Sequence, residues 1–230
     1  MKRNKNMKTC MLFITVACMG MCLTQRTLAV DAKEGTWYHP GTAIENGGFE
    51  QWGAEAGTNA ERTPTLGSDK APRNWMPDRA PGKGAVKIMK DSEIKHSGEA
   101  SARIEVAETG DEAALSQHFS VEPNTSYLVR LWVRGKDIVP ATSKPSPGIF
   151  IWANSGPAGD EFWGNQKSTP KQPPKATGTF DWQLFEFTVE TGPKAARLAI
   201  TLQLRWASGT AWFDDVEVVK REAVTPVKSY

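Results

Sequence analysis

Apolar and polar residues alternate along most of the chain after residue 97, and this period of two is the pattern of half-buried β-strands. Residues 126–135 show it most clearly, because Tyr127, Val129, Leu131 and Val133 share one face and polar or amphipathic side chains share the other. The same pattern predicts strands at residues 101–106, 114–121, 148–154, 182–190, 195–206 and 209–219, and shorter strand-like segments at 46–52 and 85–89.

The strands are short and evenly spaced, and residues 31–230 contain no segment with the period of an amphipathic helix. Two longer stretches rich in glycine, proline and charge, residues 53–98 and 155–178, interrupt the pattern. Such a chain is expected to be all-β, a two-sheet antiparallel β-sandwich whose core is closed by the inward faces of both sheets. We see no internal repeat and no second domain.

The first 30 residues have the organisation of a secretory signal peptide. Lys2, Arg3, Lys5 and Lys8 precede an apolar run at residues 9–23, and small residues follow around Ala29. A membrane anchor is the weaker alternative because a span needs about 20 apolar residues, and the residues before Cys18 only loosely resemble a lipoprotein processing site. The predicted divisions are a signal peptide at 1–30, a lead-in at 31–43, the sandwich at 44–220 and a polar tail at 221–230.

Cysteine usage and charge change once that leader is set aside. The sequence has three cysteines, and all of them lie within residues 1–30, so the remaining chain must gain its stability from a large core, a metal or both. The leader also holds five basic and no acidic residues, which turns the formal net charge from +2 for the whole chain to −3 for residues 31–230. A folded part with that charge is not expected to bind nucleic acid.

The adjacent carboxylates Asp214 and Asp215 interrupt an apolar strand pattern and require an explanation. In one interpretation, one side chain faces water and the other accepts hydrogen bonds from nearby backbone amides. In the other, Asp214 and Glu50 meet across paired terminal strands and hold a hard cation through oxygen ligands, as Ca²⁺ requires.

Several short motifs, in their order along residues 44–219, resemble the galactose-binding-like jelly-roll domains, and most closely the CenC-type carbohydrate-binding modules. They are Asn46-Gly-Gly-Phe-Glu50, Asn74-Trp75, His96-Ser-Gly-Glu-Ala100, Ser116-Gln117, Pro123-Asn-Thr-Ser-Tyr127, Leu131-Trp-Val-Arg134, Gly178-Thr-Phe-Asp-Trp182 and Phe213-Asp-Asp-Val-Glu217. The resemblance implies a structural Ca²⁺ between the first and last strands, bound by the side chains of Glu50 and Asp214 and by the carbonyls of Gly48 and Ala100. The segment after Trp52 departs from the family pattern, which leaves the remaining ligands open.

The resemblance further implies that a sugar binds on a concave aromatic-lined face or at loop tips. Aromatic rings pack against the C–H faces of sugars while amides and charged groups bind the hydroxyls. If the strands concerned are neighbours, the outward-pointing residues line one surface, which Trp163 could overhang. The candidate ligand-binding residues are Arg130, Trp132, Phe150, Trp152, Asn154, Trp163, Gln203 and Arg205.

These residues also have structural interpretations. Trp132 and Trp152 could pack in a second small core beneath the long loops, Arg130 could lie on a solvated face or in a salt bridge, and Trp75, Trp182 and Trp212 are expected in the core or at an edge.

Catalytic patterns are lacking in the sequence. His39, His96 and His118 are far apart without metal-ligand spacing and are expected at the surface or in loops. No nucleophile elbow, P-loop or dinucleotide fingerprint occurs. The only adjacent acidic pair near the second long stretch, Asp160-Glu161, lies in an expected loop, where nothing fixes the geometry that glycoside hydrolysis needs.

The sequence therefore predicts a secreted, cell-surface or periplasmic domain without enzymatic activity that binds a polysaccharide or oligosaccharide and carries a structural Ca²⁺. A separately encoded glycoside hydrolase or a cell-surface protein is a further expected partner, and no transmembrane span is expected after the leader. The alternative is a structural or adhesion domain of the same fold that binds no sugar.

Overall fold

A computed structural model of the chain describes residues 43–54, 64–79 and 85–221, and these belong to one compact unit, residues 31–230. The predicted signal peptide at 1–30 and almost all of the predicted lead-in and polar tail lie outside the described residues. Within the described ranges, no helix is long and apolar enough to cross a membrane.

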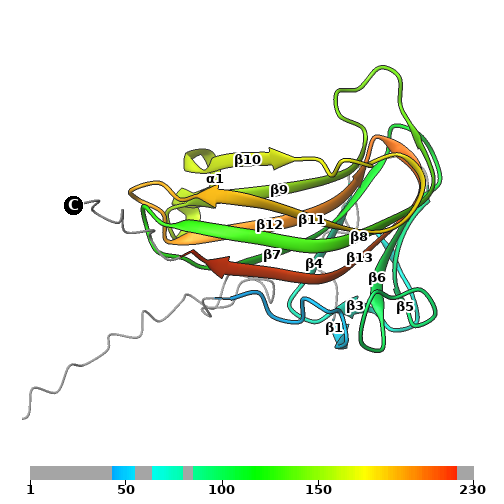
Figure 1. The fold of residues 1–230 in the computed structure, drawn as a ribbon, viewed down its shortest axis with the longest axis horizontal. Coiled ribbons are helices and arrows are strands. Elements are labelled where there is room, and N and C mark those ends of the chain that lie inside the picture. The colour runs from blue at the N-terminus through cyan, green and yellow to red at the C-terminus, as the bar shows by residue number, and fades with distance from the viewer. Residues whose placement is uncertain (1–42, 55–63, 80–84, 222–230) are drawn as a thin grey trace, which may run out of the picture. The chain divides into compact units, whose positions relative to one another are not determined.

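Two large β-sheets make up the fold (Figure 1). The five-stranded sheet has the order β10 (Lys167–Lys171), β9 (Gly148–Gly156), β12 (Arg197–Arg205), β7 (Glu112–Ser120) and β4 (Met76–Arg79). The six-stranded sheet has the order β11 (Gly178–Glu190), β8 (Ser126–Pro140), β13 (Ala207–Lys220), β6 (Ser101–Val106), β5 (Val86–Asp91) and β2 (Thr65–Leu66). Within the two sheets, neighbouring strands are antiparallel except for β2 and β5, which are parallel.

The core lies between these sheets and is built from the apolar side of the alternating pattern. On β8 it takes Val129, Leu131 and Val133, and on β12 it takes Leu198, Ile200, Leu202 and Leu204, all of them fully buried. Burying one such side chain stabilises the fold by roughly 1.5 to 3 kcal/mol. The predicted all-β antiparallel sandwich is therefore confirmed.

The segment at 46–52 differs from its prediction. Only its end is extended, in β1 (Trp52–Ala54), which pairs with β3 (Ala71–Pro72) in a small separate sheet. Asn46 and Phe49 have positive φ angles of 51° and 54°, and the Phe49 N–H donates to the Asn46 carbonyl oxygen at 3.1 Å. This tight turn aims Glu50 and its neighbours at the final strand instead of extending a sheet.

The two long stretches contain regular structure that the sequence pattern only partly predicted. Described parts of residues 53–98 supply β2 to β5, of which only β5 was expected in the form of a strand near 85–89. Residues 155–178 supply a 3₁₀ turn, η1 (Gly159–Glu161), a single helical turn, α1 (Phe162–Asn165), and the edge strand β10. The segment α1 to β10 packs beside β9 and so borders the outer face of the five-stranded sheet.

Candidate functional site

A groove of about 360 Å³ crosses the outer face of the five-stranded sheet. Its lining comes from the side of each strand that points away from the core, in agreement with the predicted parity of β9 and β12. The lining residues lie on β4, β7, β12 and β9 and on the segment from α1 to β10: Met76, Asp78, Ala114, Ser116, His118, Trp152, Asn154, Trp163, Gln166, Ser168, Ala199, Thr201 and Gln203. Four of the predicted ligand-binding residues, Trp152, Asn154, Trp163 and Gln203, therefore lie together.

Hydrogen bonds across neighbouring strands fix the floor of this groove. The Trp152 indole Nε1–H donates to Gln203 Oε1 at 3.0 Å, which joins β9 to β12. The hydroxyls of Ser116 and Thr201 lie 2.9 Å apart and join β7 to β12. The half-buried indole is consequently held in one orientation, with amide and hydroxyl groups beside it. Such a mixture of a fixed aromatic ring and a few polar groups is typical of small-molecule sites.

Trp163 forms the rim of the groove and is the most exposed tryptophan among the described residues, at 59%. Its neighbour Phe162 is fully buried and meets it edge-on at a centroid distance of 5.2 Å. The side chain of Gln166 accepts a hydrogen bond from the Gly164 N–H at 2.7 Å. Phe162 therefore anchors the short segment, while the ring of Trp163 stays accessible above the sheet.

His118 lies within the groove lining but is 2% exposed, so the expectation of a surface or loop residue is wrong. It stands on β7, and its ring contacts the rings of Phe162 and Trp163 at centroid distances of 5.3 and 5.9 Å. Burial, together with the nearby positive charge of Arg197, lowers the pKa of His118 to about 3. The imidazole is therefore neutral at ordinary pH, and among the described residues that line the groove only Asp78 has a charged side chain at that pH.

Phe150 and Arg205 stand on the same outer face but next to the groove instead of in its lining. They are only 6% and 8% exposed, because the Arg205 guanidinium carbon lies 4.3 Å from the Phe150 ring centroid and 3.6 Å from that of Trp206. Burial lowers the pKa of Arg205, opposed by the nearby charge of Glu112. Phe150 also links this cluster to the groove, because its ring centroid lies 5.2 Å from that of Trp152.

Trp132 and Arg130 do not join this group, so the expectation of one common surface is wrong. They lie on β8, which belongs to the six-stranded sheet, and outward side chains of the two sheets point to opposite sides of the sandwich. Trp132 stacks on His96 at a centroid distance of 3.8 Å and an interplanar angle of 15°. Arg130 lies in a salt bridge with Glu186 at 3.1 Å and is 3.7 Å from Glu217.

The first described segment and the last strand meet beside that second face. The Val216 N–H donates to the Gly47 carbonyl oxygen at 2.9 Å. A Cβ added to Gly47 would lie 2.0 Å from the Val216 carbonyl oxygen, so only glycine permits this approach. The two ends of the sandwich on which the predicted calcium site depends are therefore neighbours.

Three carboxylates around this contact accept hydrogen bonds from one turn, residues 96–99. Asp214 is fully buried, and its Oδ2 accepts from the backbone N–H groups of His96 and Ser97 at 2.8 and 3.2 Å. Burial raises the pKa of Asp214 to about 6, against the opposing effect of these amides. Asp215 accepts from the Ser97 hydroxyl at 2.7 Å and lies 2.6 Å from His96 Nδ1.

Glu50 completes the arrangement, since both of its oxygens lie 3.0 Å from the Glu99 amide nitrogen. A Cβ added to Gly48 would lie 3.8 Å from Glu50 Oε1 and 3.7 Å from Asp215 Oδ1, so two carboxylates border this glycine. The described residues contain no group of three or more His, Cys, Asp or Glu side chains placed to hold a metal ion. The oxygen donors suit Ca²⁺ in chemistry, but the side chains alone would not complete its coordination and backbone carbonyls would have to contribute.

Sequence reasoning missed the groove residues on β7 and β4. Ser116 and His118 interrupt the strand predicted at 114–121 at alternate positions, opposite in parity to the core residues Leu115 and Phe119. That parity was a usable signal for the outer face. Asp78 carried no such signal, because β4 has only four residues and lies within a proline-rich stretch.

Comparison of the sequence with protein-family profiles and with curated proteins gives no match. Comparison of structures does. The enzymatically active domain of tailspike protein 4 of bacteriophage CBA120 superposes with a TM-score of 0.51 at 15% identity, over 64% of this chain and 19% of that one. The chain thus spans about a fifth of the length of that enzymatically active domain.

A cyclase from Fischerella sp. TAU gives a TM-score of 0.50 at 16% identity and covers 79% of this chain and 98% of that one. A family 4 carbohydrate-binding module gives 0.48 at 18% identity, over 77% and 99% of the two chains, and modules of families 61, 22 and 16 also match. The solved structures that match thus include several carbohydrate-binding modules, as the sequence resemblance predicts, but none supports the CenC type in particular. Because every identity is low, these comparisons speak only for the fold.

Proposed function

We propose that this protein is a secreted, non-catalytic domain that binds a polysaccharide or oligosaccharide in the groove of the five-stranded sheet. The observation that carries the proposal is the fixed indole of Trp152, hydrogen-bonded to Gln203, in a groove that the exposed ring of Trp163 also lines. Sugar rings pack on such aromatic planes, and the neighbouring hydroxyls and amides match sugar hydroxyls. The low charge of the lining favours a neutral sugar.

Catalysis is not part of the proposal. His118 is neutral and nearly inaccessible, which makes it a poor acid or base, and the described residues of the groove lining include no second carboxylate that could complete a hydrolytic pair with Asp78. The alternative, an adhesion domain of the same fold, predicts no affinity for sugars at this groove.

We also propose that a structural Ca²⁺ links the ends of the sandwich, held by Glu50 and Asp214 with the carbonyls of Gly48 and Ala100. The support is the approach of Gly47 to Val216 and the gathering of carboxylates around residues 96–99. Calcium would supply the charge that balances these acids, and the protein residues would fix the spacing of the two chain segments.

The function is tested by retention in affinity gels that contain a panel of neutral polysaccharides. We expect Trp152→Ala to weaken retention at least tenfold, about 1.4 kcal/mol, because the sugar loses its stacking plane. Trp163→Ala should act in the same direction. The control is Trp132→Ala, which removes a tryptophan on the opposite face and should bind the polysaccharide as the unmodified protein does.

Circular dichroism spectra of the three variants establish that each is folded. Failure of the unmodified protein to bind any polysaccharide in the panel would favour the adhesion alternative. Loss of binding in Trp132→Ala with full binding in Trp152→Ala would mean that the sugar binds on the six-stranded sheet, which contradicts the proposal.

A further inference from the structure

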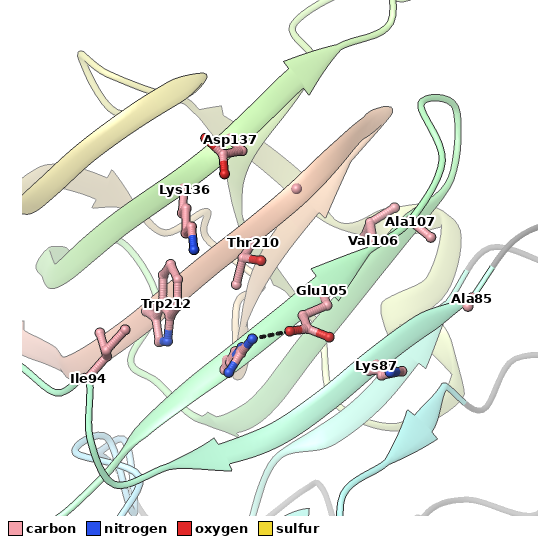
Figure 2. A pocket seen from close by; sticks show the side chains of 12 residues that line it. Ala85, Lys87, Ile94, Glu105, Val106, Ala107, Lys136, Asp137, Thr210 and Trp212 are labelled. Atoms are coloured by element: carbon pink, nitrogen blue, oxygen red, sulfur yellow. Dashed lines mark hydrogen bonds and ion pairs between the residues drawn. The ribbon is translucent and has the colours of Figure 1, made fainter.

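A second cavity, of about 530 Å³, lies on the outer face of the six-stranded sheet (Figure 2). It extends over β13 and is bordered by β8 on one side and by β6 and β5 on the other. None of its lining residues contributes to the groove described above, and it belongs to the opposite face of the sandwich. It is therefore a separate potential site.

The cavity lies where β13 carries the small residues Gly209 and Thr210, and Thr210 is paired with the longer residues Glu105 on β6 and Lys136 on β8. Gly209 has a φ of 119°, and a Cβ there would lie 2.5 Å from the Asp137 carbonyl oxygen, so a larger residue cannot replace it. The pairing of β13 with β8 shifts between Ser208 and Thr210, which marks a β-bulge. Bulges redirect side chains and often border functional sites. The short side chain of Thr210 forms the floor (Figure 2).

Three basic side chains line this cavity: Lys136 on β8, on one side of β13, and Arg103 on β6 and Lys87 on β5, on the other side. Lys87 and Lys136 make no ion pair within the part of the chain that the structure describes. Both are exposed from opposite walls (Figure 2), and their ammonium groups are thus available to an anion.

Arg103 is held in place instead of being free. Its guanidinium lies 5.6 Å from the centre of the Trp212 ring, is 3.6 Å from Asp91 Oδ2 and forms an ion pair with Glu105. Its Nε is buried and has no hydrogen-bond partner among the described residues. A charged group fixed in this way loses little entropy when it binds a ligand.

Acceptors for hydroxyl groups lie among these cations. Glu105 and Asp137 contribute carboxylates and Thr210 a hydroxyl to the same lining. A simple inorganic anion would be attracted by three cations but repelled by two carboxylates. A ligand that carries one negative group and several hydroxyls satisfies both kinds of side chain, because its anion pairs with the cations and its hydroxyls donate to the carboxylates.

We propose that this cavity binds an acidic sugar, a unit that carries a carboxylate together with free hydroxyls. The site is independent of the groove of the five-stranded sheet and goes beyond the function proposed for it. With both faces occupied, one domain could bridge a neutral and an acidic polysaccharide.

The test is titration calorimetry of the full chain with trigalacturonate, with neutral galactotriose and with sodium sulfate as probes. We expect trigalacturonate to bind, and the double variant Lys87→Gln/Lys136→Gln to bind it at least tenfold more weakly. The matched control is Lys194→Gln, which removes an exposed charge in the turn between β11 and β12 and should leave the affinity unchanged. Trp152→Ala should also retain full affinity, which separates this site from the groove.

Raising the salt concentration should weaken the interaction, as expected for a pairing of exposed charges. The proposal is overturned if trigalacturonate does not bind or if the double variant binds it as well as the unmodified protein does. In Trp152→Ala, which lacks the stacking plane of the groove, equal affinity for galactotriose and trigalacturonate would mean that this cavity does not recognise the carboxylate. Equal affinity for sulfate would mean that it does not recognise the sugar. If instead Trp152→Ala abolishes trigalacturonate binding, the acidic sugar occupies the groove and this second site is rejected.

Discussion

The backbone N–H of Val216 donates a hydrogen bond to the carbonyl oxygen of Gly47 at 2.9 Å, which joins the first described segment of the chain to its last strand. The two residues are far apart in sequence, so this contact closes nearly the whole domain. Each of the joined segments carries a carboxylate, Glu50 or Asp214, that accepts hydrogen bonds from the turn at residues 96–99. Stability of the domain should therefore respond to any change at this junction.

Removal of calcium should lower the stability of this junction. If Ca²⁺ links the two ends, EDTA should lower the melting temperature, since a ligand present at 100 times its Kd stabilises the folded state by about 2.7 kcal/mol. For a domain of this size that corresponds to roughly 5 to 10 °C. Differential scanning calorimetry with EDTA, with added Ca²⁺ and with added Mg²⁺ measures the effect, and Glu50→Gln should reduce it. Identical melts with and without EDTA would argue against the calcium site.

Replacement of Gly98 tests the packing at the same junction without metal. Gly98 has a φ of 60°, and a Cβ there would lie 1.9 Å from Glu50 Oε1. We expect Gly98→Ala to lower the free energy of unfolding by about 1 to 3 kcal/mol, because both the backbone and Glu50 become strained. Gly192→Ala is the control, since nothing lies within 4 Å of its added Cβ. Urea unfolding gives both values, and equal midpoints for the two variants would contradict the expectation.

His118 should make stability depend on pH. Burial and Arg197 lower its folded-state pKa to about 3, below the ordinary value of 6.5, so folding favours the neutral ring. Its contribution is complete above pH 6.5 and is lost as the pH falls toward 3, by about 1.4 kcal/mol for each unit in that window. Unfolding of the unmodified protein and of His118→Gln at pH 7 and pH 5 should show the smaller decline in the variant. Parallel declines would mean that His118 is not the group responsible.

Trp212 is expected to stabilise the outer face of the six-stranded sheet. Its indole donates to Asp91 Oδ2 at 2.9 Å, and the guanidinium carbons of Arg103 and Arg134 lie 5.6 and 5.7 Å from the centre of its ring. Trp212→Phe removes the donor from a nearly buried carboxylate and should cost about 1 to 3 kcal/mol of unfolding free energy. Trp163→Phe, at a largely exposed position, should change it by less than about 0.5 kcal/mol. Chemical denaturation of both variants measures the two unfolding free energies. A larger loss in Trp163→Phe than in Trp212→Phe would refute this role for Trp212.

Much of the fold could be predicted from the alternation of apolar and polar residues within each strand. The alternation around Val129 and Leu131 on β8, and around Ile200 and Leu202 on β12, marked which residues face the core, because burial of apolar surface acts on each strand with a period of two. The same alternation correctly predicted that the side chains of Trp152 and Gln203 point away from the core. It also predicted the sandwich, since one-faced strands must cover one another.

Which strands become neighbours was not a local property, and only the tertiary structure decided it. Trp132 and Trp152 show the same outward pattern, but β8 pairs with β11 and β13 whereas β9 pairs with β10 and β12, so the two rings lie on opposite faces. His118 looks like a surface residue in sequence and is buried because Phe162, from a distant loop, packs on it. Side-chain alternation records whether a residue faces the core, while the location of a site depends on hydrogen bonds and contacts between segments that are remote in sequence, and these leave no periodic signal in either segment alone.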